Sequence, residues 1–184
     1  MAVWQQTSSV EAFDNFTDLP ENADRLFEFI GGETVEVPSN PFASYIGSRI
    51  LRHIANYVEL HHLGYVTGEA GGYMVSGERY APDVAYISKE RQPELARQGY
   101  NPNPPDLAVE IDFPSTYQSQ KDLRVKVANY LAAGTLVWVV LPETKMVEVY
   151  TPGQPIKLLK LDGVLDGGTL FPRFTLAVQE IFPE

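Results

Sequence analysis

Two strand-length apolar stretches with a helical segment between them constrain the fold of this chain most. Residues 136–141 are apolar throughout, which is typical of a strand covered on both faces, and residues 106–112 have an apolar centre. The intervening residues 115–133 have apolar side chains at helical spacing: Leu123, Val127, Tyr130 and Leu131. A helix inserted between two central strands predicts an α/β fold, in which a mixed β-sheet is flanked by helices.

The segment before these strands predicts a hairpin and a long helix. The Gly-Gly pair at 31–32 can adopt the positive φ angles of a tight turn, so we expect residues 25–30 and 33–37 to pair as strands. Residues 39–41, Ser-Asn-Pro, place a capping residue before a proline and favour a helix start. The apolar face of this helix is formed by Ile46, Ile50, Leu51, Ile54 and Val58.

Further strands are expected on both sides of the central pair. We expect residues 65–75 and 80–87 to be strands joined near Gly77, and the proline-rich residues 89–105 to be a loop. The C-terminal part adds two strands and a short helix, expected at residues 146–150, 156–161 and 176–181.

The length of 184 residues suits one domain with a substantial core. We expect an acidic N-terminal segment over residues 1–20, followed by the domain over residues 21–184. The sequence contains no cysteine, which excludes disulfides, thiolate metal sites and cysteine nucleophiles. No stretch reaches the roughly 18 apolar residues of a membrane helix, and residues 1–6 resemble no signal peptide, so we expect a soluble cytoplasmic protein without a membrane partner.

The formal net charge is −10, which disfavours nucleic acid as a partner because phosphate binding depends on Lys and Arg. The acidity is concentrated near the N-terminus, however. Residues 1–36 carry eight acids and one arginine, a net charge of −7, which leaves −3 for the rest of the chain. A locally basic groove is therefore compatible with the sequence.

Acids at strand ends, followed by a lysine on a helix, have the clearest chemical meaning. Asp83 follows Pro82 where one strand begins, and Glu110 lies toward the end of another. Two carboxylates on neighbouring strands can hold Mg²⁺, which typically takes one or two carboxylates with waters and phosphate oxygens. Asp112 shares a strand face with Glu110. The pattern predicts a magnesium-dependent phosphoester site, with Mn²⁺ as an alternative ion.

Lys126 is the lysine that we expect to act at this site. It lies four residues before Tyr130, so the two share a helical face toward the sheet, whereas Lys121 points elsewhere. A lysine beside a metal-bound water can orient it or help to deprotonate it. The alternatives are that Asp83 caps a turn and that Lys126 pairs with Asp122 one turn earlier.

Several motifs in the same order resemble the Uma2 family of restriction-type endonucleases. They cover most of the chain, from residue 28 to residue 182, and lie at residues 82–86, 105–111, 126–134, 137–140 and 147–150. That family is similar to the PD-(D/E)XK nucleases, whose core is a mixed sheet flanked by helices and whose site has two acids and a lysine around Mg²⁺. The resemblance therefore implies a single restriction-endonuclease-like domain.

The resemblance also implies roles for individual residues. Asp83 and Glu110 correspond to the metal ligands, and Lys126 to a catalytic lysine supplied by the helix rather than the strand. Asp112 stands where the usual superfamily motif has its lysine, and residues 112–115 replace the family's common Ser-Pro-Ser. The histidine often found near the start of the first long helix is absent.

A further acid often comes from the region near the first long helix in such nucleases. Glu28 and Glu36 are both candidates, and the sequence does not distinguish them.

Two functions follow from these residues. One is a Mg²⁺-dependent endonuclease that hydrolyses nucleic-acid phosphodiester bonds, with DNA as the expected substrate and a homodimer as the expected form for cutting both strands. The other is an inactive nuclease-fold module for interaction or dimerisation. The enzyme requires Asp83, Glu110 and Lys126 to meet in one cleft under a positive rim. Basic residues that could line such a groove are Arg79, Lys89, Arg91, Lys121 and Arg124.

Overall fold

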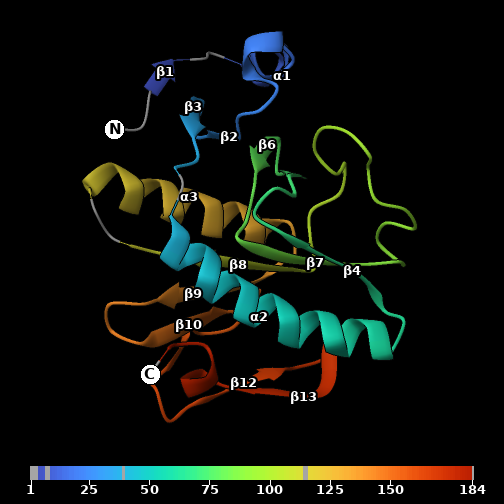
Figure 1. The fold of residues 1–184 in the computed structure, drawn as a ribbon, viewed down its shortest axis with the longest axis vertical. Helices are drawn as coiled ribbons and strands as arrows, with labels where there is room; N and C mark the ends of the chain where they lie inside the picture. Colours follow the sequence, from blue (N-terminus) through green and yellow to red (C-terminus); the bar gives the residue numbers. More distant parts are fainter. Residues whose placement is uncertain (1–3, 7–8, 39, 114–115, 184) are drawn as a thin grey trace.

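The computed structural model describes residues 4–6, 9–38, 40–113 and 116–183. A six-stranded sheet lies at its centre in the order β11-β10-β9-β8-β7-β4 (Figure 1). The strands β8 and β9 run parallel, and the neighbouring pairs around them are antiparallel. The bounds are β4 Gly64–Gly68, β7 Val84–Ser88, β8 Leu107–Ile111, β9 Leu136–Leu141, β10 Met146–Tyr150 and β11 Lys157–Leu159. The expected α/β fold with a mixed sheet is confirmed.

One face of the central sheet packs against α2 and a C-terminal hairpin. Alternate residues of each strand point to this face, as Val84 and Tyr86 of β7 do, and their side chains join the core formed with α2. The helix begins with the Asn40 cap, whose side chain accepts the backbone N–H groups of Phe42 and Ala43. Ser39 of the expected capping sequence lies outside the described residues. The bounds are α2 Pro41–Leu60, β12 Val164–Gly167 and β13 Phe171–Ala177.

The other face packs against α3 and a second sheet. Ala85 and Ile87 of β7 point to this face, where they contact a core that includes Tyr130 of α3. The helix α3, Tyr117–Ala132, connects the parallel strands β8 and β9 and lies above the central sheet in Figure 1. The second sheet has the order β1-β3-β2-β6-β5, with bounds β1 Trp4–Gln6, β2 Phe27–Ile30, β3 Glu33–Glu36, β5 Tyr73–Val75 and β6 Glu78–Tyr80.

Short helices complete the chain at both ends. The helix α1, Val10–Thr17, is capped by Ser9, and its buried Phe13 packs on Phe29 with 5.5 Å between ring centroids. Single 3₁₀ turns occupy Pro20–Asn22 and Val178–Glu180. No helix in the described ranges is both long enough and apolar enough to cross a membrane.

Two of the expected strands are each broken in two. The chain leaves the central sheet after β4, forms the β5–β6 hairpin in the second sheet, and returns as β7 after Pro82. The break after β4 contains Gly72, where an added Cβ would lie 2.3 Å from the ring of Tyr100, so only glycine fits without a shift. The expected turn near Gly77 is confirmed as the turn between β5 and β6, with a φ of 87° at Gly77.

The expected C-terminal helix over residues 176–181 is wrong in its first part. Residues up to Ala177 belong to β13, and only Val178–Glu180 form a helical turn. Phe174, Leu176 and Val178 are buried at a period of two, as in a strand that packs on one side. These side chains pack on the same face of the central sheet as α2. Their burial there therefore outweighs the local helical pattern.

Candidate functional site

A buried lysine links two carboxylates that come from different sheets. Lys126 of α3 donates hydrogen bonds from Nζ to Oε1 of Glu28 at 2.8 Å and to Oε2 of Glu110 at 2.6 Å. Glu28 lies on β2 of the second sheet and Glu110 on β8 of the central sheet. All three residues are less than one tenth exposed. Glu110 shares the α3-facing side of β8 with Ala108, which is why its carboxylate meets the helix.

Both carboxylates accept a further hydrogen bond, Glu110 at its other oxygen and Glu28 at the same Oε1. Tyr130 donates from its hydroxyl to Oε1 of Glu110 at 3.0 Å, and it lies four residues after Lys126 on the same face of α3. The backbone N–H of Ala81 donates to Oε1 of Glu28 at 2.7 Å. Glu110 is therefore fixed by two side chains from consecutive turns of one helix.

Asp83 joins the same cavity from the start of β7. Its Oδ2 accepts the backbone N–H of Ile111 at 2.6 Å, which attaches the beginning of β7 to the end of β8. Asp83, Glu110, Lys126 and Glu28 all line one cavity of about 280 Å³. The structure thus brings together the three residues that the sequence selected, and it adds Glu28.

Burial and the excess of acids around Lys126 raise the pKa values of two carboxylates in this cavity, Asp83 and Glu110. Burial raises the pKa of Asp83 to about 6, and the negative charge of Glu28 adds to the shift against the opposing effect of Lys126. Burial also raises the pKa of Glu110, with Glu28 and Asp83 contributing and Lys126 opposing. Burial by itself lowers the pKa of Lys126, but Glu110 and Glu28 outweigh it and keep the lysine charged.

Two further acids that line the cavity, Asp112 and Asp122, have partners of their own. Asp112 accepts from Nε2 of Gln120 at 3.0 Å, and Asp122 accepts from Nε2 of Gln118 at 2.9 Å. The alternative of a Lys126–Asp122 pair is therefore wrong, because the lysine turns inward to Glu28 and Glu110.

Glu28 and Glu36, which the sequence left open, differ in their surroundings. Glu36 forms an ion pair of 2.7 Å with Arg25 outside the cavity, where both side chains are about one third exposed or more. Glu28 is buried beside Lys126, so it is the acid that belongs to this cluster.

The donors in the cavity suit a hard cation that takes few protein ligands. No group of three or more His, Asp or Glu residues in the described ranges is arranged as a ready metal site. Asp83 and Glu110 supply carboxylate oxygens, and Mg²⁺ commonly takes only one or two carboxylates and completes its shell with waters and phosphate oxygens. A divalent cation would also offset the excess of negative charge. Each carboxylate oxygen of Glu110 accepts one hydrogen bond, so a lone pair remains on each oxygen for such an ion.

The expected positive rim is wrong for this cavity. Among the described residues that line it, Lys126 is the only lysine or arginine. Arg79 pairs with Asp14 at 2.8 Å and Arg91 with Asp106 at 3.1 Å, while Lys89 lies 6.0 Å from the centre of the Tyr65 ring. The other two basic residues that the sequence suggested, Lys121 and Arg124, lie together on the outer side of α3.

Sequence reasoning missed the contact of Tyr130 with Glu110 as part of the site. The signal for it was present, because the spacing of four residues places Tyr130 beside Lys126 on the same helix. The contact of Ala81 with Glu28 has no such local signal, since the two residues meet only when β6 pairs with β2.

The fold and the sequence of the chain are similar to those of known proteins. The chain resembles "a putative nuclease belonging to DUF820 from Anabaena variabilis ATCC 29413", with a TM-score of 0.76 and 22% sequence identity over 91% of this chain and 95% of that one. The likeness extends to the whole fold. No curated protein matches the chain significantly. The family described as "Uma2: Putative restriction endonuclease" matches residues 13–179, and the chain therefore belongs to the Uma2 family.

Proposed function

We propose that this chain is a metal-dependent nuclease that hydrolyses phosphodiester bonds at the cavity between β2, β7, β8 and α3. One observation carries the proposal: Asp83, Glu110 and Lys126, from three separate elements, line a single cavity. Membership of the Uma2 family supports the same conclusion.

Each residue of the cluster has a role in this proposal. Asp83 and Glu110 hold Mg²⁺ or Mn²⁺ through their carboxylates, and the bound ion supplies an activated water and neutralises charge that develops on the phosphate. Lys126 keeps its proton, because the carboxylates beside it raise its pKa, and so it acts as a positive charge that orients the water or the phosphate. Glu28 holds the ammonium of Lys126, and Tyr130 holds the carboxylate of Glu110.

The family's description supports nucleic acid as the substrate, and DNA is the member of that class that we propose. A homodimer with two sites related by a two-fold axis would allow both strands of a duplex to be cut. Light scattering coupled to size exclusion tests the dimer independently of activity. We propose that the protein is located in the cytoplasm.

The proposal is tested by metal binding and cleavage on the same variants. Isothermal calorimetry with Mg²⁺ and with Mn²⁺, beside a plasmid-cleavage assay, compares wild type with Glu110→Gln and Asp83→Asn, which preserve size. Glu36→Gln is the matched control, since it removes an acid outside the cavity. We expect both cavity variants to lose metal binding and cleavage, and the control to keep them.

The competing function, an inactive interaction module, predicts a different result. A folded wild-type protein that binds neither ion and leaves every plasmid intact would support that module and overturn the nuclease. Cleavage that persists in Glu110→Gln would place the chemistry elsewhere in the chain.

A further inference from the structure

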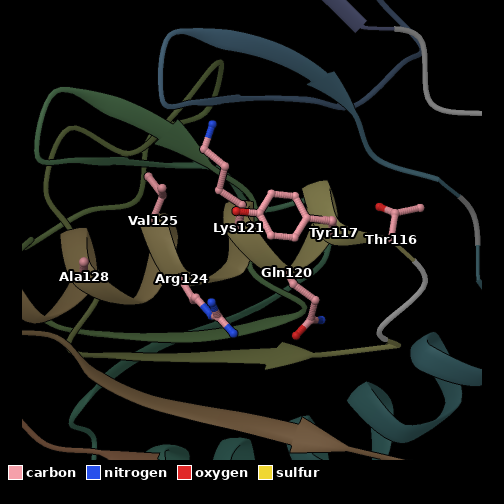
Figure 2. A pocket seen from close by; sticks show the side chains of 7 residues that line it. All are labelled: Thr116, Tyr117, Gln120, Lys121, Arg124, Val125 and Ala128. Carbon is pink, nitrogen blue, oxygen red and sulfur yellow. The ribbon is translucent and has the colours of Figure 1, made fainter.

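The outer side of α3 carries a shallow hollow of about 600 Å³ that is separate from the acidic cavity. Figure 2 shows the side chains that line it, among them Tyr117, Gln120, Lys121 and Arg124. Their spacing of three and four residues places them on one side of the helix. Tyr117 and Lys126 are nine residues apart, about two and a half turns, so this side is opposite to the one that carries Lys126.

The hollow is basic in a strongly acidic chain. Lys121 and Arg124 are exposed, and neither forms an ion pair with any carboxylate in the described part of the chain. From this shared outer side of α3, the side chains of Lys121 and Arg124 extend in opposite directions across the helix (Figure 2). A polyanion that crosses the helix would therefore meet a positive charge at two points.

Tyr117 adds an aromatic surface beside these charges. Its side chain is 84% exposed, although burial of aromatic area is normally favourable. A free tyrosine ring next to basic residues is the combination that binds single-stranded nucleic acid, because bases of any sequence can stack on it while cations contact the phosphates.

The hollow and the acidic cavity adjoin each other at the first turns of α3. Gln120 lines the hollow and donates its Nε2 to Oδ2 of Asp112 at 3.0 Å, and Asp112 lines the cavity. One ligand can therefore lie over the basic side of the helix and reach the cavity beside it.

We propose that the outer side of α3 binds the backbone of a nucleic-acid strand and delivers its scissile phosphate to the acidic cavity, with Lys121 and Arg124 on phosphates and Tyr117 stacked on a base. This inference rests on the proposed nuclease function. Without a bound cation the cavity repels phosphate, because the described residues that line it include five acids and one lysine. Substrate binding thus needs cations outside it, and Lys121 and Arg124 lie beside it.

Binding without cleavage tests this surface directly. Fluorescence anisotropy with a labelled single-stranded DNA oligonucleotide, in EDTA and over a range of salt concentrations, compares wild type with Lys121→Ala/Arg124→Ala. The matched control is Arg97→Ala/Lys160→Ala, which removes the same charge from exposed positions outside the hollow. We expect the slope of log binding constant against log salt concentration to fall in magnitude by about 1.4 for Lys121→Ala/Arg124→Ala, which is the value for two phosphate contacts on a single strand. The slope of the control should remain near that of the wild type.

Tyr117→Ala tests the stacking step. It should weaken binding of the single strand by about fivefold or more, the low end of what stacking of one base contributes, while the salt slope is preserved. The same loss for a blunt duplex, whose bases are already stacked on each other, would overturn the role of the tyrosine.

Failure of this inference can be told apart from failure of the nuclease proposal. Equal loss of DNA binding in both double variants would show that the outer side of α3 is not the binding surface. Cleavage by Lys121→Ala/Arg124→Ala at the wild-type rate would show the same, and the nuclease proposal would stand in either case if the wild type binds metal and cleaves DNA. Calorimetry with Mn²⁺ on Lys121→Ala/Arg124→Ala should give the wild-type affinity, and a loss there would also overturn the assignment to substrate binding.

Discussion

Tyr130 donates a hydrogen bond to one oxygen of Glu110 while Lys126, four residues earlier on α3, donates to the other. The carboxylate of Glu110 is thereby fixed between two consecutive turns of a helix that also connects β8 to β9. Any shift of α3 along the sheet would separate Glu110 from both partners. The geometry of the site is thus tied to the packing of α3.

Lys126→Met should destabilise the fold strongly. The substitution keeps the length and apolar stem of the side chain but leaves the buried carboxylates of Glu28 and Glu110 without a cation. Removing one partner from a buried ion pair costs about 3–5 kcal/mol. Urea unfolding at neutral pH, monitored by circular dichroism, measures the loss.

A double variant is the control for this prediction. Lys126→Met combined with Glu110→Gln should recover part of the lost stability, because one of the uncompensated charges is removed as well. If Lys126→Met alone lowers the free energy of unfolding by less than about 1 kcal/mol, the lysine is not needed to offset the buried acids.

Tyr130→Phe should cost about 1–3 kcal/mol, the usual effect of leaving one buried acceptor unsatisfied. The hydroxyl is fully buried, and its loss should also raise the pKa of Glu110 further. Tyr150→Phe is the matched comparison, since Tyr150 donates to Glu148 at 2.6 Å where both residues are only partly buried. Chemical unfolding of the two variants side by side should give the larger loss for Tyr130→Phe, and equal losses would contradict it.

The β8–α3–β9 unit and the pair of Glu110 and Lys126 could be predicted from the sequence. The two residues are only 16 positions apart, and their orientations follow from the two-residue period of the strand and the helical spacing of α3. Local pattern therefore determines which way each side chain points.

Glu28 could not be chosen over Glu36 from the sequence, because its contact with Lys126 spans 98 positions. It depends on the pairing of β2 with β6, which occurs through a single register pair, Phe29 with Arg79. Nothing in the local sequence indicates that pairing. The same long-range sheet explains why the expected strands over residues 65–75 and 80–87 are each divided.

Gly72→Ala should destabilise the segment between β4 and β5. An added Cβ would lie 2.3 Å from the ring of Tyr100, whose hydroxyl donates to the backbone carbonyl of Phe27 next to Glu28. Overpacking of this kind costs about 1–3 kcal/mol. Differential scanning calorimetry should show a lower melting temperature, and Gly72→Ala/Tyr100→Leu should recover part of it. An unchanged melting temperature in the single variant would show that Tyr100 has room to move.

Asp83 should make the metal-free protein less stable as the pH rises through about 6. Its pKa is raised to about 6 in the folded state, against about 3.9 in an unfolded chain, so the folded protein holds this proton more tightly. The resulting stabilisation is fully present below about pH 4 and is lost as the pH passes 6. Besides burial, the charges of Glu28 and Glu69 raise this pKa, and that of Lys126 lowers it.

Asp83→Asn removes this titration while its side-chain oxygen can still accept the N–H of Ile111. The free energy of unfolding of the variant, relative to wild type, should therefore increase between about pH 4 and pH 7.5 in EDTA. Urea titrations of both proteins at each pH give this difference directly. A difference that stays constant or decreases over that range would mean that Asp83 ionises in the fold as easily as in water, and the charge imbalance inferred for the cavity would then be wrong.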